Sequence, residues 1–252
     1  MAKIKFVKDE IYHIYNRGTE KRTIFLEKLD YLRFVHSLFE FNDENPASPT
    51  NIRFASRFPS QAKAVRIEKC LEVQPLNMQY LDKIKSRDPL VEILAFTLMP
   101  NHFHLLLREI KEGGIVRFMQ KLGTGYAMYF NKKYDRVGTL FQGRFKARIV
   151  DTIEYLEYML FYIHFNCLDL IEPEWRAGKV EDFQKTIRFL DTYRWSSYID
   201  YIGQKNFPSV IQRDFILKIL DGSQDHKRIV EKWLKGIATK LSSESFRDLI
   251  IE

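Results

Sequence analysis

Two apolar segments, at 91–98 and 102–109, occupy the middle of the 252-residue chain and are separated only by residues 99–101. Each segment is rich in aliphatic and aromatic residues and has the length of a buried strand. The sequence Met-Pro-Asn between them indicates a tight connection. The segments therefore predict two consecutive strands at the centre of the fold.

Further strands and helices are predicted on both sides of this pair, from short β-branched and aromatic runs and from hydrophobic residues at helical spacing. They are a strand at 12–15, a helix at 29–41, a helix at 115–133, a strand at 144–150 and a helix at 153–165. Asp151 and Thr152 are suited to cap the last helix. The order β-α-β-β-α-β followed by a helix predicts an α+β fold, a ferredoxin-like sandwich with an antiparallel sheet and helices on one face.

The pattern divides the chain into a domain at 1–170 and a helical extension at 171–252. Inside the domain, residues 43–89 are rich in Pro, Ser and Asn and are interpreted as an insertion or a long loop, with a short helix at 64–71. The extension is predicted to contain helices near 180–190, 210–220 and 227–241.

Cysteine content and hydropathy favour a cytoplasmic protein. Cys70 and Cys167 are the two cysteines, and neither belongs to a Cys-x-x-Cys pair, which favours a reducing compartment. The most apolar run, 90–99, is about half the length of a membrane span and contains Glu92. The first ten residues contain no apolar signal segment. We therefore expect neither secretion nor a membrane segment.

Positive charge is concentrated in one stretch. The formal net charge is +7, and residues 115–150 contain eight basic residues against one acid. Aromatic side chains are interleaved with them, and this combination is typical of a groove for single-stranded nucleic acid. A solvated basic face over an aromatic core is the alternative. The basic residues are Arg117, Lys121, Lys132, Lys133, Arg136, Arg144, Lys146 and Arg148.

His102 and His104 lie two residues apart in the strand predicted at 102–109. Successive side chains of a strand point to opposite faces, so both imidazoles emerge on one face, with Cα atoms about 6–7 Å apart. This spacing allows both to bind one divalent metal ion. A lone His-x-His motif is a weak signal, and two polar residues on a half-exposed strand are the alternative. His13 is interpreted as a histidine packed within the sheet, and a position near the metal is the alternative.

Tyr162 and Asn166 lie four residues apart at the end of the helix predicted at 153–165, and therefore share one face. A phenol beside a metal-facing amide oxygen indicates a tyrosine nucleophile acting next to the ion. Its ordinary pKa is about 10, so such a nucleophile requires activation. A core aromatic is the alternative, because tyrosines recur along this helix at helical spacing. His164 lies on another face and is placed outside the site.

Several motifs together resemble one transposase family. Residues 98–107 (LMPNHFHLLL) resemble the HUH signature of single-tyrosine transposases. The other matching motifs are 12–18 (YHIYNRG, a first strand), 138–146 (GTLFQGRFK), 162–166 (YIHFN, the tyrosine helix) and 193–198 (YRWSSY). Across about residues 10–200 the chain thus resembles the insertion-sequence-200-like transposases, and among them most of all the REP-associated tyrosine transposases.

The resemblance implies a metal-dependent transposase that cleaves and rejoins single-stranded DNA next to hairpins. Tyr162 matches the catalytic tyrosine, which attacks a DNA phosphate and gives a 5′-phosphotyrosine and a free 3′-OH. His102 and His104 match the histidines that hold Mg²⁺ or Mn²⁺, and Asn166 matches the third ligand position. A second DNA strand resolves this intermediate without ATP.

Partners follow from the same resemblance. Hairpin-forming single-stranded DNA is the expected partner, and Gln142 joins the eight basic residues as a predicted DNA contact because its motif falls in the basic stretch. The family includes dimers and monomers, so a homodimer and a monomer both agree with the sequence. The expected location is the cytoplasm, at the nucleoid when DNA is bound.

Two departures and three alternatives stand beside this prediction. Asn166 is followed by Cys-Leu-Asp where the family commonly has Pro-Val, which changes the exit of the helix, and the insertion at 43–89 is longer than in compact members. One alternative is another HUH enzyme, a relaxase or replication initiator, which often has two tyrosines or a helicase domain. Another is a domesticated protein that binds hairpin DNA without cutting it. A zinc hydrolase would need a further ligand, for which no spacing is evident.

Overall fold

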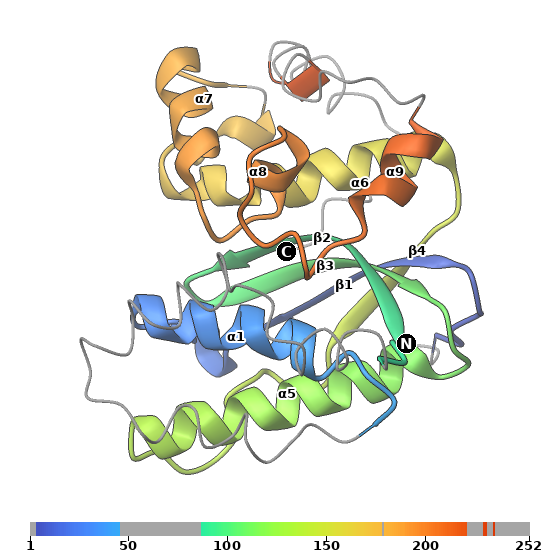
Figure 1. The fold of residues 1–252 in the computed structure, drawn as a ribbon. Helices are drawn as coiled ribbons and strands as arrows, with labels where there is room; N and C mark the ends of the chain where they lie inside the picture. The colour runs from blue at the N-terminus through green and yellow to red at the C-terminus, as the bar shows by residue number, and fades with distance from the viewer. Residues whose placement is uncertain (1–3, 46–86, 178, 221–228, 231–233, 235–252) are drawn as a thin grey trace.

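The computed structural model describes residues 4–45, 87–177 and 179–220, together with residues 229, 230 and 234 (Figure 1). The short helix predicted at 64–71 lies outside the described residues, as do most of the insertion predicted at 43–89 and most of the helix predicted at 227–241. None of the described helices is long and apolar enough to cross a membrane.

Four antiparallel strands form one sheet, in the order β2-β3-β1-β4. The strands are β1 (Ile11–Arg17), β2 (Val91–Met99), β3 (His102–Glu109) and β4 (Lys146–Val150). Helix α1 (Lys28–Glu40) connects β1 to β2, and α5 (Gly114–Lys133) connects β3 to β4. This arrangement confirms the predicted α+β, ferredoxin-like fold.

Strand β4 begins at Lys146, two residues later than the predicted start at Arg144. The cause is a turn at Gly143, whose φ of +71° is incompatible with an extended ladder. The N–H of Gly143 donates to the carbonyl of Phe141 (2.8 Å). A glycine at this position lets the chain reverse direction before it joins the edge of the sheet.

Helices α1 and α5 cover one face of the sheet (Figure 1). The alternation along β3 sends Phe103, Leu105 and Leu107 to this face, and all three are buried. Phe34 of α1 packs against Phe103, and Tyr126 of α5 packs against Phe34, each with ring centroids 4.9 Å apart. Aromatic and aliphatic side chains therefore fill the layer between the sheet and these two helices.

Helix α6 (Ile153–Phe165) lies over the opposite face (Figure 1). Thr152 caps its first turn as predicted, because its hydroxyl accepts the N–H of Tyr155 (3.1 Å). Ten of the thirteen residues of α6 are buried. Burial around the whole helix is expected for one that lies between a sheet and further helices.

The segments that follow α6 complete this second layer. They are the 3-10 helices η2 (Asn166–Leu170) and η3 (Trp175–Ala177) and the helices α7 (Phe183–Thr192), α8 (Tyr198–Tyr201) and α9 (Arg213–Ile219); a further 3-10 helix, η1 (Thr19–Lys21), follows β1. α7 and α9 correspond to the helices predicted near 180–190 and 210–220.

The C-terminal segment also bonds to the outer edge of β2. The N–H of Leu98 donates to the carbonyl of Trp195 (2.9 Å), and the N–H of Gln212 donates to the carbonyl of Ile93 (2.8 Å). Buried side chains on both sides of residue 170 belong to one hydrophobic cluster. The extension is therefore packed on the sheet as part of one core, and residues after 170 have access to the same face as α6.

Candidate active site

His102 and His104 project from β3 toward α6, on the face opposite Phe103. Their ring centroids lie 5.0 Å apart, which agrees with the predicted emergence of both imidazoles on one face. The Nδ1 atom of His102 lies 2.6 Å from Oδ1 of Asn101, and Nδ1 of His104 lies 2.8 Å from Nε2 of His13. These contacts orient both rings and leave Nε2 as the nitrogen that each ring presents to the pocket.

His13 was interpreted from the sequence as a histidine packed in the sheet. It is buried and stacks on His104 with ring centroids 5.1 Å apart, so it also holds one of the two candidate ligands in place. The contact between His13 and His104 follows from the register of β1 against β3. Tyr15 pairs with His104, and His13 lies two residues away on the same face of the sheet. Local sequence pattern does not encode that register.

Burial keeps the three imidazoles neutral. Desolvation lowers the pKa of His102 from 6.5 to about 4 and that of His13 from 6.5 to about 3. The pKa of His104 is also lowered well below 6.5, first by burial and then by the neighbouring histidines and Arg176. A neutral imidazole is the form that binds a metal ion.

Tyr162 comes from α6 and faces the histidine pair. Its ring centroid lies 5.9 Å from that of His104 and 6.0 Å from that of His13. The side chain is 3% exposed. The tyrosine and the histidines therefore meet within a single chain. His164 faces away, as predicted, and its Nε2 lies 2.9 Å from the hydroxyl of Ser197.

Asn166 ends α6 and lies next to Tyr162. Its Nδ2 donates to the carbonyl of Tyr162 (2.7 Å), which directs its Oδ1 toward Arg176, whose Nη2 donates to it (2.9 Å). Arg176 also forms an ion pair with Asp169 through Nη1. Its guanidinium lies over the rings of Trp175 and Tyr162, 4.6 and 5.6 Å from their centroids.

Arg176 and Asp169 also line the pocket but were not predicted from the sequence. Both follow α6, and only the reversal of the chain through η2 and η3 returns them to the site. An arginine ten residues after Asn166 carries no local pattern that separates it from a surface arginine. The proximity of Arg176 to the site can therefore be seen only in the tertiary structure.

The pKa of Tyr162 is raised, mainly because the hydroxyl is buried. Arg176 opposes that effect through its charge and a hydrogen bond, and Asn166 opposes it through a further hydrogen bond. The environment thus contains one cation that favours the phenolate, next to a tyrosine that is otherwise held in its neutral form.

These side chains line a pocket of about 180 Å³ that opens between β1, β3 and the start of the C-terminal segment. Its lining also includes the half-buried Tyr15, Asn16 and Arg17 and the exposed Lys21, Gln142 and Lys146. Nε of Arg17 donates to Oε1 of Gln142, and Nζ of Lys146 lies 5.8 Å from the ring centroid of Tyr15. Cations and an aromatic ring therefore surround the entrance.

The nine predicted DNA contacts fall into two groups. Gln142 and Lys146 line the pocket, and Arg148 lies opposite His13 in the sheet, where its charge opposes the rise that burial causes in the pKa of Tyr155. Arg144 is exposed in the turn before β4. The structure does not bring the other five to the pocket, because they lie on or directly after α5 beyond the far face of the sheet: Arg117, Lys121, Lys132, Lys133 and Arg136.

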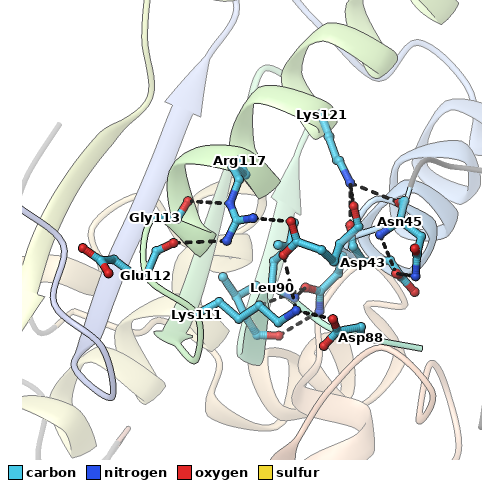
Figure 2. A network of polar contacts seen from close by, with 12 residues as sticks. Asp43, Asn45, Asp88, Leu90, Lys111, Glu112, Gly113, Arg117 and Lys121 are labelled. Atoms are coloured by element: carbon cyan, nitrogen blue, oxygen red, sulfur yellow. Dashed lines mark hydrogen bonds and ion pairs between the residues drawn. The ribbon is translucent and has the colours of Figure 1, made fainter. Parts of the chain in front are cut away.

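Contacts made by the α5 group are intramolecular where the structure describes them. Arg117 is paired with Glu44, and Lys121 donates to the backbone carbonyls of Asp43, Glu44 and Asn45. Figure 2 shows Arg117 and Lys121 extending into this network beside Asp43 and Asn45. Lys133 forms ion pairs with Glu27 and the buried Asp30, and Arg136 donates to Asn131. Arg117 and Lys121 thus hold residues 43–45 against α5, and Lys133 holds the start of α1 there.

The donors at the site fit a divalent ion. They are the Nε2 atoms of two neutral imidazoles, His102 and His104, and the amide oxygen of Asn166, which has a second lone pair beside the one that Arg176 occupies. Nitrogen and amide-oxygen ligands suit a borderline ion such as Mn²⁺ and are tolerated by Mg²⁺. Within the described residues, no group of three or more His, Cys, Asp and Glu side chains is arranged to hold a metal.

Comparison with known proteins gives one family match. Residues 72–166 match the family model of IS200-like transposases. The match contains His102, His104, Tyr162 and Asn166, and it confirms the resemblance that the motifs indicated for this part of the chain.

One solved structure, described as a REP-associated tyrosine transposase bound to a REP hairpin, is similar to the chain at 12% sequence identity and a TM-score of 0.44. The similarity covers 84% of this chain and 90% of that one. No curated protein matches the chain.

Proposed function

We propose that the protein is a transposase that cuts and joins single-stranded DNA through Tyr162. The observation that carries this proposal is the position of the Tyr162 ring, 5.9 Å from His104 inside one pocket, in the part of the chain that matches the IS200-like transposase model. Nucleophile, candidate metal ligands and phosphate-attracting cations come from one chain.

In the proposed reaction, the Oη atom of Tyr162 attacks the phosphorus of a DNA phosphate. The new Oη–P bond replaces the P–O3′ bond, so the downstream strand is held as a 5′-phosphotyrosine and the upstream strand ends in a 3′-OH. The phenol proton is lost and the 3′ oxygen gains one, so the step is balanced. Attack by the 3′-OH of another strand reverses it with the same bond count.

The residues of the pocket have separate tasks in this reaction. His102, His104 and Asn166 would hold Mg²⁺ or Mn²⁺, which when bound supplies charge that polarises the phosphate and stabilises the leaving oxygen. His13 and Asn101 fix the two imidazoles through their Nδ1 atoms.

At the entrance, Arg17, Lys21 and Lys146 attract the phosphate backbone, and Tyr15 offers a stacking surface for a base. A single-stranded DNA flanked by a hairpin is the substrate we propose from the sequence motifs.

The test is the formation of a covalent protein–DNA adduct. A 3′-labelled library of single-stranded DNA hairpins is incubated with the protein and Mn²⁺ or Mg²⁺ and resolved on a denaturing gel. We expect a labelled band at the mass of the protein that disappears with EDTA and in Tyr162→Phe. Binding of the library without any adduct would favour the domesticated binding protein instead, and an adduct retained in Tyr162→Phe would favour an HUH enzyme with a second nucleophile.

A further inference from the structure

Arg176 belongs to the pocket although it lies ten residues beyond the end of the matched family segment. The match ends at Asn166, whereas Arg176 is carried by η3 in the C-terminal segment. Its guanidinium nevertheless lines the same pocket as His102 and Tyr162. The C-terminal segment thus contributes a cation to the pocket, next to the ring of Tyr162.

The side chain is held firmly in this position. Asp169 binds Nη1, Oδ1 of Asn166 accepts from Nη2 at 2.9 Å, and the ring of Trp175 supports the guanidinium from 4.6 Å. Only 16% of the side chain is exposed, compared with 71% for Lys179 three residues later. Because a guanidinium carries five N–H groups, one side chain can bind a carboxylate, an amide and a phosphate oxygen together.

The location of Tyr162 fixes where an attacked phosphate would lie. Its phosphorus must be next to the Tyr162 hydroxyl, and the guanidinium of Arg176 lies 5.6 Å from the centroid of that ring. Of the other cations that line the pocket, Lys21 and Lys146 are exposed, and Arg17 donates to Gln142. Arg176, which lies over the Tyr162 ring, is therefore a cation placed to meet charge that develops on the phosphate during attack.

We propose that Arg176 is a catalytic residue that binds a non-bridging oxygen of the phosphate attacked by Tyr162. The inference rests on the proposed function and extends it to a residue outside the matched segment. Arg176 neither gains nor loses a proton in this role. It stabilises the negative charge on the phosphate oxygens while the Oη–P bond forms and the P–O3′ bond breaks.

The first experiment compares the rate of adduct formation in single-turnover conditions, with the hairpin library and Mn²⁺. We expect Arg176→Gln to lower the rate by about 100-fold or more, since removal of one preorganised donor costs 10²–10³ in other enzymes. Arg176→Lys keeps the charge but loses the planar fork, and about a 10-fold decrease is expected. Lys179→Gln, in the same segment but exposed, is the matched control and keeps the wild-type rate.

A structural ion pair with Asp169 is the competing explanation, and the double variant Arg176→Gln/Asp169→Asn separates the two. Removing both charges relieves the unpaired carboxylate that Arg176→Gln alone leaves behind. If Arg176 acts on the phosphate, the double variant recovers the melting temperature and stays about 100-fold slow. Recovery of the rate to within about 3-fold of wild type would overturn the proposal.

A binding measurement separates this inference from the proposed cleavage. In the Tyr162→Phe background, the affinity for the same library is measured against salt concentration. One lost phosphate contact on a single strand lowers the slope of log K against log salt by about 0.7, and we expect that decrease for Arg176→Gln. An unchanged slope contradicts the role of Arg176. A changed slope with no adduct from the wild-type protein leaves the phosphate contact standing and contradicts the proposed cleavage.

Discussion

The two faces of the sheet bury polar groups for different purposes. On the α6 face, His13, His102 and His104 are buried beside Tyr162 and open into a pocket. On the α1/α5 face, the same two strands present aliphatic and aromatic side chains to a closed core, such as Phe103. Since side chains alternate along a strand, the eight residues of β3 contribute both to the pocket on one face and to the hydrophobic core on the other.

Asp30 is a buried charge on the α1/α5 side of the sheet. Its carboxylate is fully buried and accepts from the hydroxyls of Tyr129 (2.9 Å) and Tyr134 (2.7 Å) and from Lys133. It also accepts the N–H of Leu26 (2.8 Å) at the start of α1. Every contact is made within the chain, so this charge fixes α1 against α5.

Arg176, on the α6 face, is likewise held by several side chains, but it also lines a pocket. Burial of a charge is therefore a sign of function only where the surrounding groups leave room for a ligand.

The largest effect is expected at Tyr162. Tyr162→Phe removes the nucleophilic oxygen, and the yield of covalent adduct should fall by at least about 1,000-fold, while hairpin binding changes little. Tyr158→Phe is the matched control, one turn away on α6 with its ring stacked 5.9 Å from that of Tyr162. Adduct formation measured on denaturing gels should persist in Tyr158→Phe; the reverse result would assign the nucleophile to Tyr158.

Substitution of two neighbouring residues of β3, one on each face of the sheet, compares the roles of the two faces directly. His104→Ala should weaken Mn²⁺ binding, measured by calorimetry, by about 100-fold because it removes one of two imidazole ligands. Leu105→Ala points the other way, into the closed core, and should lower the free energy of unfolding by about 2–5 kcal/mol with little change in Mn²⁺ affinity. Equal losses of metal affinity in both variants would show that His104 acts only through the fold.

The neighbour relations that the sequence predicted and the structure confirms lie within single elements. His102 and His104 share a face because of strand alternation, and Tyr162 lies next to Asn166 because of helical spacing. The order of strands and helices was likewise readable from hydrophobic periodicity, which depends on neighbours a few residues away.

Contacts between distant elements could not be read in this way. The pairing of β1 with β3, which brings His13 to His104, joins residues 91 positions apart. The basic stretch at 115–150 is one run in the sequence, but its cations lie on both sides of the sheet. Lys133, for example, is bound to Asp30, 103 residues away, beside α1 and α5. The composition of a segment gives its net charge. It does not show which face of the sheet a helix in that segment will cover.

Acid should destabilise the α6 face. Burial lowers the pKa of His102 to about 4 and that of His13 to about 3 in the folded protein, from 6.5. As pH falls below 6.5 the unfolded chain binds protons that the folded chain does not, so the stability present above pH 6.5 is lost toward pH 4.

Urea denaturation in EDTA at pH 7 and pH 5 should show a loss of about 2 kcal/mol for each of these histidines. In His102→Gln the difference between the two pH values should shrink by about a third, because His13 and His104 still titrate in the same way. A difference of wild-type size in that variant would place the titrating groups elsewhere in the protein.

The smallest expected effect is a change in DNA affinity when one cation from each of the two groups is removed. Lys146 at the pocket rim and Arg117 on α5 both belong to the basic stretch, but only Lys146 faces the proposed DNA path, while Arg117 is paired with Glu44. Lys146→Gln should weaken single-stranded hairpin binding by about 3-fold to 10-fold and lower the salt slope by about 0.7, measured by fluorescence anisotropy. Arg117→Gln should leave both quantities unchanged, because its charge is already used to hold residues 43–45 against α5. A larger loss of DNA affinity in Arg117→Gln than in Lys146→Gln would move the binding surface to the opposite face of the sheet, away from Tyr162.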